Sequence, residues 1–240
     1  MDNCKNCSET ISGNYCSNCG QAVKFKRIDR HYITHEIEHV LHFERGIFYT
    51  IKELLRNPGQ NIRNYITDNN RSKLVKPIIF IIITSLIYSI INHLFHIEDG
   101  YIKFDETKKS ATGSIFEWIQ AHYGYANIMM GIFIAFWAKL FFRKYDYNFF
   151  EILILLCFVM GIGMLIFSFF ALIQGLTHIN LMQVAGAVGM VYTIWAIGHF
   201  FDKNKAMNYV KAFASYMLGT LTFFILVLII GVVFELAIKH

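Results

Sequence analysis

The chain has 240 residues, of which 55% are hydrophobic and only 16% are charged. This composition is more apolar than that of an average soluble domain and indicates a membrane protein. The formal net charge is +5, and polar and basic residues are concentrated in the first 76 positions. The first twenty residues contain no apolar segment of the signal-peptide type, so we expect the amino terminus to stay in the cytoplasm.

Residues 1–22 contain two CxxC motifs, Cys4 with Cys7 and Cys16 with Cys19, separated by eight residues. Each motif can form a tight knuckle that presents two thiolates to one tetrahedral zinc ion. Two disulfides are the alternative, but they would need an oxidising compartment. We therefore predict a zinc ribbon whose four cysteines hold one structural zinc ion and leave no open position for a catalytic water.

Residues 23–76 have the pattern of basic amphipathic helices beside the membrane. The first predicted helix follows Arg30 and carries histidines on one side and aliphatic residues on the other. The second follows Gly46 and stops at Asn57-Pro58-Gly59. We expect the helices to lie on the cytoplasmic membrane face or to dock under the spans. Anionic lipid headgroups are the expected partners of the basic side chains, with nucleic acid as the lesser alternative, and these side chains are Arg56, Arg63, Arg71, Lys73 and Lys76.

The stretch HEIEH, from His35 to His39, matches the HExxH pattern of zinc metalloproteases. His35 and His39 could bind a zinc ion, and Glu36 could polarise its water. The sequence supplies no third histidine at the metzincin spacing, no second glutamate motif and no Asp-Gly pair within a span. We therefore predict that the protein is not an enzyme, and protease chemistry with a second metal site at His35 and His39 is the less favoured alternative.

Five apolar runs are each long enough to cross a hydrocarbon core about 30 Å thick. The predicted fold class is accordingly an all-α polytopic membrane protein with a small zinc ribbon and amphipathic helices before the first span. Few ionisable residues lie within the runs, which argues against a proton relay or a coupled transporter. The predicted transmembrane bundle covers 77–240, with spans near 77–95, 126–142, 149–173, 179–201 and 212–237.

Lysines and arginines determine which way the spans are inserted. They are abundant before the first span, and they recur after the second span, at Arg143 and Lys144, and after the fourth, at Lys203 and Lys205. The rule that positive loops stay inside predicts a cytoplasmic amino terminus, and five spans then place the carboxyl terminus in the periplasm. We expect the protein to reside in a bacterial inner membrane, with the lipid bilayer as its first partner.

Three stretches, NYCSNCGQ, HEIEHVLHFERGIFYTIKELLRNPGQNIRNYI and NRSKLVKPIIFI, together resemble an uncharacterised bacterial family of zinc-ribbon-headed multi-spanning membrane proteins. The resemblance covers residues 1 to about 90 and implies a membrane protein with a zinc-binding head, but no particular activity. The chain departs from the family pattern at Asp68-Asn69-Asn70, where a glycine is usual before the arginine. The recurring features are the helix carrying Glu36, Gly46, the run Thr50–Leu55, the pair Pro58-Gly59, and the stretch Arg71–Pro77.

These features together predict a non-enzymatic integral membrane protein. Its cytoplasmic zinc ribbon and basic helices would recruit or sense an unidentified cytoplasmic partner. The alternative is a homo-oligomeric channel, or a membrane effector or accessory of a bacterial anti-phage system of the RNA-guided type. That alternative is an association by protein type, because small multi-spanning membrane proteins occur in such systems.

Overall fold

The chain divides into two compact units, Met1–Glu44 and Arg45–His240. In the first unit, the computed structural model describes the residues around the cysteines. In the second unit it describes nearly all of the helical part. The described residues are Cys4, Cys7, Glu9, Thr10, Gly13, 16–19, 46–67, 73–95, 97, 113, 115, 119 and 123–238.

The second unit is built from helices. Five of them are long and apolar enough to cross a membrane, and they are α4, α6, α7, α8 and α9. The prediction of an all-α polytopic membrane protein is confirmed. The described helices are α2 (Ile47–Arg56), α3 (Pro58–Thr67), α4 (Pro77–Phe95), α6 (Tyr123–Phe141), α7 (Phe149–Thr177), α8 (Met182–Asp202) and α9 (Ala206–Ile238), with a 3-10 turn at Arg143–Tyr145.

Local sequence explains where several helices begin. Pro77 starts α4, as expected for a residue that has no N–H to leave unpaired in the first turn. Asn148 and Glu151 form a capping box at the start of α7. The last helix begins at Ala206, earlier than the apolar run that starts near 212, and its first turn includes buried Asn208. The Asn208 amide donates to the carbonyl of Asp202 at 3.2 Å.

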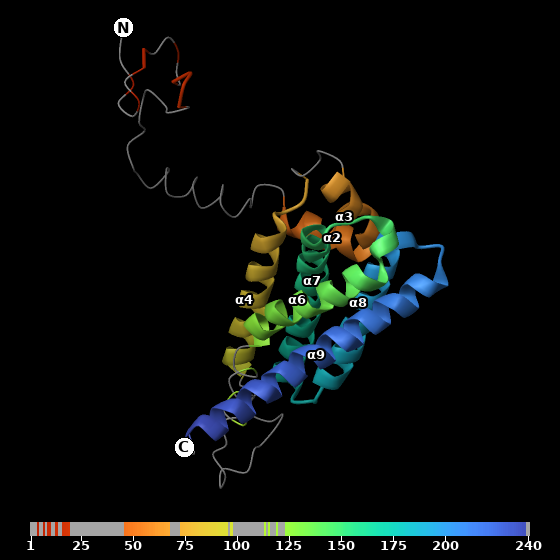
Figure 1. Ribbon diagram of the computed structural model, residues 1–240. Helices are drawn as coiled ribbons and strands as arrows, with labels where there is room; N and C mark the ends of the chain where they lie inside the picture. The colour runs from red at the N-terminus through yellow and green to blue at the C-terminus, as the bar shows by residue number, and fades with distance from the viewer. Residues whose placement is uncertain are drawn as a thin grey trace. The chain divides into compact units, whose positions relative to one another are not determined.

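Helix α7 occupies the middle of the bundle and packs against α4, α6 and α8. Helix α9 covers α6 and α8 and runs obliquely along the bundle (Figure 1). Close contact between α4 and α7 depends on Gly161, where a β-carbon would lie 2.7 Å from the ring of Phe80. The ring of Phe158 lies beside that of Phe80, with centroids 5.9 Å apart. Aromatic and aliphatic side chains of α7 therefore form the centre of the core.

Helices α2 and α3 lie together at one end of the bundle, near the start of α4 (Figure 1). Leu54 of α2 and Ile62 of α3 are both fully buried. Tyr65 of α3 meets Phe158 of α7 edge to face, with ring centroids 5.3 Å apart. The sequence predicted that the helices of this segment lie on the membrane face or dock under the spans. Helices α2 and α3 are docked against the spans.

The end that contains α2 and α3 also carries most of the charge in the described helical unit. It holds the turns between α6 and α7 and between α8 and α9. In the half of the described spans nearer the other end, the only acidic, lysine or arginine residue is Glu235. The basic residues at or near the α2 and α3 end are Lys52, Arg56, Arg63, Lys73, Lys76, Lys139, Arg143, Lys144, Lys203, Lys205 and Lys211, and the acidic ones are Glu53, Asp146, Glu151 and Asp202.

Candidate functional site

The four cysteines of the first unit converge on one point. The Sγ atoms of Cys4, Cys7, Cys16 and Cys19 all lie within 4.8 Å of one another. Cys4 faces Cys19 and Cys7 faces Cys16, each pair with sulfurs 3.5 Å apart. Cys4 and Cys16 are buried although the described part of this unit contains few other apolar side chains. The cysteine cluster that the CxxC spacing predicts is therefore present in the structure.

This cluster has the dimensions of a tetrahedral metal site. Zinc–thiolate bonds of about 2.3 Å would place four sulfurs about 3.8 Å apart, within the range of the observed separations. All four cysteines are free thiols, and 3.5 Å is well beyond the length of a disulfide bond, about 2.05 Å. The donor set, four sulfurs and no carboxylate, suits a soft or borderline metal ion.

Electrostatics in the cluster favour a bound cation over four free thiolates. A backbone hydrogen bond at Glu9 lowers the pKa of the Cys7 thiol. The thiols of Cys19, Cys16 and Cys4, together with burial, outweigh it and raise the pKa of Cys7 to about 12. Without a metal the Cys7 thiol therefore keeps its proton at neutral pH. A bound metal ion would replace that proton, which is the usual coupling between metal binding and deprotonation.

A second metal site is predicted at His35 and His39. His35, Glu36 and His39, and the amphipathic helix predicted to carry them, lie outside the described residues. Among the residues that the structure describes, the four cysteines form the one group of metal-binding side chains close enough to share an ion.

A second polar assembly joins α3 to the end of α8. The N–H of Gly59 donates to Nδ1 of His199 at 3.3 Å. A β-carbon on Gly59 would overlap the carbonyl of His199 and would lie 2.7 Å from the backbone nitrogen of Phe200. The His199 ring also stacks on Trp195, with an angle of 8° between the ring planes. Only glycine allows the two main chains to approach this closely.

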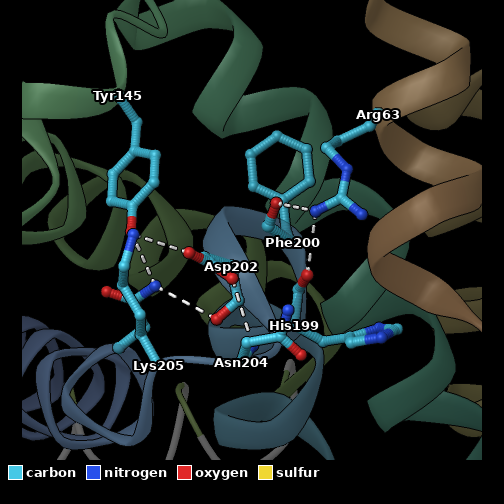
Figure 2. Close-up of polar contacts among 8 residues, drawn as sticks. Arg63, Tyr145, His199, Phe200, Asp202, Asn204 and Lys205 are labelled. Carbon is cyan, nitrogen blue, oxygen red and sulfur yellow. Dashed lines mark hydrogen bonds and ion pairs between the residues drawn. The ribbon is translucent and has the colours of Figure 1, made fainter.

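Arg63 follows Gly59 by one helical turn and faces the same end of α8. Its Nη1 donates to the carbonyl oxygens of His199, at 3.0 Å, and Phe200, at 2.5 Å (Figure 2). Its Nη2 donates to Oε1 of Gln60 at 3.0 Å. Carbonyls in the last turn of a helix have no partner within that helix and carry partial negative charge. The guanidinium therefore caps α8 from a neighbouring helix.

The turn that leads from α8 to α9 is tied by polar contacts beside this cap (Figure 2). Lys205 forms an ion pair with Asp202 at 2.7 Å, and this contact raises the pKa of the exposed Lys205 ammonium. The backbone N–H of Asn204 donates to Oδ1 of Asp202 at 3.1 Å. These contacts are local and hold the reversal of chain direction.

Several ionisable side chains in the spans also have structural partners. Lys139 of α6 donates to the carbonyl of Tyr147 at 2.5 Å. Lys211 of α9 donates to the carbonyl of Phe141 at 3.2 Å. Glu151 accepts from the N–H of Asn148 at 2.7 Å. These groups link or cap helices.

Residues 44–89 match the model of a family described as "Protein of unknown function (DUF3667)". The matched region contains α2, α3 and most of α4, and therefore Gly59 and Arg63. Comparisons with curated proteins and with solved structures give no match. The family match supports the part of the predicted resemblance that lies in this segment, and it carries no activity.

Proposed function

We propose that the protein is a non-enzymatic membrane protein whose amino-terminal head holds a structural zinc ion and presents a recognition surface to a cytoplasmic partner. The observation that carries the proposal is the convergence of the Sγ atoms of Cys4, Cys7, Cys16 and Cys19 within 4.8 Å. Four thiolates complete a tetrahedral shell, so the metal would fold the head and leave no coordination position for substrate.

The distribution of charge supports a cytoplasmic head in a bacterial inner membrane. Basic residues gather at the end of the bundle where α4 begins, which is the end expected to face the cytoplasm. The sequence between Cys19 and α2 contains no apolar run long enough to span a bilayer. The head therefore belongs on the side of the membrane occupied by the basic end, where reducing conditions keep its thiols available for metal.

Recruitment of a partner is favoured over transport or catalysis by the roles of the polar residues. Lys139, Glu151 and Lys211 are engaged in helix caps and links, so they are poor candidates for carrying protons or substrates. A small metal-folded head joined to a membrane anchor suits binding of a macromolecule.

Proximity labelling from the amino terminus of the full chain tests the recruitment proposal. Membranes containing the native chain, Cys16→Ser and Cys157→Ser would be compared at equal abundance. We expect a distinct set of cytoplasmic neighbours that Cys16→Ser loses, because its metal site is incomplete. Cys157→Ser should retain that set, because Cys157 belongs to α7 and to neither CxxC motif. The same neighbours with all three chains would contradict recruitment by the head.

A further inference from the structure

The side of α2 that faces away from the bundle carries a regular mixture of apolar and basic side chains. We call it the outer face of α2, and it consists of Phe48, Tyr49, Lys52, Leu55 and Arg56, all of which are exposed. Phe48 is 82% exposed and Leu55 is 50% exposed. At about 100° per residue, Phe48 and Leu55 lie on one line along the helix, with the two cations beside it.

Packing against the bundle does not explain this face, because the opposite side of α2 already provides that packing. Thr50 and Leu54 are fully buried there, and Ile47 and Ile51 pack partly against the core. Phe48 and Leu55 are exposed, on the side of the helix away from Thr50 and Leu54. Large apolar side chains that point outward next to cations are typical of helices that lie in a membrane interface.

Two hydrogen bonds attach α2 to the start of α4 and to α8. The N–H of Val75, just before α4 begins at Pro77, donates to Oγ1 of Thr50 at 3.0 Å. The hydroxyl of Tyr192 donates to the carbonyl of Leu54 at 3.2 Å. Tyr192 lies midway along α8, about 15 Å from the end of that helix at Asp202. Helix α2 therefore lies beside the start of α4 and beside the second half of α8, not beyond them.

The basic residues of the outer face indicate what kind of partner it binds. Lys52 and Arg56 belong to the strongly basic end of the helical unit, which favours an anionic partner. The headgroup layer is about 5 to 8 Å thick on each side of the hydrocarbon, and interfacial helices sink about 5 to 10 Å into this boundary. An aromatic ring and a leucine at this depth reach acyl chains, and cations one helical turn away reach phosphates.

We propose that the outer face of α2 binds anionic phospholipids of the membrane that the protein spans. Phe48 and Leu55 insert among the acyl chains, while Lys52 and Arg56 bind lipid phosphates. The family-matched segment would then anchor the helical unit in the plane of the bilayer in addition to its spans. This inference does not depend on the function proposed for the head.

Photo-crosslinking of the full chain identifies what covers this face. Phe48 would be replaced by a benzophenone-bearing phenylalanine analogue, and the protein would be reconstituted in nanodiscs of phosphatidylcholine and phosphatidylglycerol. Phe150 of α7, 74% exposed, provides the matched lipid-facing position. We expect lipid adducts at both positions. Adducts of position 48 with the protein's own residues, or no adduct at 48 while 150 reacts, would overturn the proposal.

The preference for anionic lipid is tested by removing the two cations. The pair Lys52→Gln and Arg56→Gln would be compared with Arg143→Gln and Lys144→Gln, which remove the same charge from exposed residues at the same end. Native mass spectrometry would measure phosphatidylglycerol retained against phosphatidylcholine. We expect a loss of about fivefold per cation from the α2 pair and less than twofold from the control pair. Equal losses, or no loss from the α2 pair, would contradict the proposal.

Discussion

Gly59 and His199 are 140 positions apart in the sequence, yet the N–H of one donates to Nδ1 of the other at 3.3 Å. Their main chains are in contact, because a β-carbon on Gly59 would overlap the His199 carbonyl. Arg63 adds two hydrogen bonds to the same end of α8. The family-matched segment is therefore packed into the spans as part of the bundle.

Gly59→Ala should destabilise the helical unit, because the added methyl group forces α3 away from α8. Overpacking of this kind costs about 1 to 3 kcal/mol. Thermal unfolding of the detergent-solubilised chain would measure it as a lower Tm. Gly186→Ala is the control, since a β-carbon there meets nothing within 4 Å and alanine favours the helix. Equal Tm values for the two variants would contradict the close approach.

Arg63→Met should also lower stability, because it removes a charged cap from the carbonyls of His199 and Phe200 while keeping a long apolar side chain. Hydrogen bonds that involve a charged group contribute about 1.5 to 3 kcal/mol, and the partial exposure of Arg63 places the expected loss near the lower value. Arg143→Met, at an exposed position of the neighbouring turn, should change Tm little. Unfolding in denaturant provides an independent measurement, and a larger loss from Arg143→Met would refute the capping role.

Two buried serines in the spans should respond oppositely to alanine. Ser168 donates to the carbonyl of Met164 in the same helix at 2.7 Å, so Ser168→Ala loses a hydrogen bond and should cost about 0.5 kcal/mol. The hydroxyl of Ser85 has no hydrogen-bond partner among the described residues, so Ser85→Ala removes an unsatisfied polar group. We expect Ser85→Ala to leave Tm unchanged or raise it. A loss equal to that of Ser168→Ala would show that the Ser85 hydroxyl is engaged.

The charge asymmetry of the bundle predicts opposite membrane sides for the two ends of the chain. An epitope at the amino terminus should be protected from protease in intact cells, and one at the carboxyl terminus should be digested once the outer envelope is opened. Reversing charge at Arg143 and Lys144 should weaken this preference, because cationic loops resist translocation. Digestion of the amino-terminal epitope in intact cells would reverse the proposed orientation.

Local patterns in the sequence predicted the spans and the cysteine cluster. Apolar runs identify helices such as α7 whatever packs around them, and CxxC spacing brings sulfurs together through short loops. The number of spans and the closeness of the cysteines are confirmed. Zinc as the metal, the membrane orientation and a channel as the alternative function stay predictions.

Long-range pairing could not be predicted in the same way. Asn57-Pro58-Gly59 indicates the end of a helix, and α2 does end at Arg56. Nothing in those residues shows that Gly59 must also admit the main chain of α8. Arg63 was interpreted as one of several lipid-facing cations, because sequence cannot show which carbonyls lie within its reach. The sequence likewise cannot show that Leu54 is buried and Phe48 is exposed, because this difference depends on which helices pack against α2.

Metal analysis of the purified full chain tests the zinc head on which the proposed function rests. We predict one zinc ion per native chain, none with Cys16→Ser, and one with the control Cys157→Ser, because the four CxxC sulfurs converge on one point and Cys157 belongs to α7. Removal of the ion with a chelator should expose the four thiols to alkylation and leave the helical content nearly unchanged. A native chain without metal, or with its CxxC sulfurs joined as disulfides, would contradict the proposal.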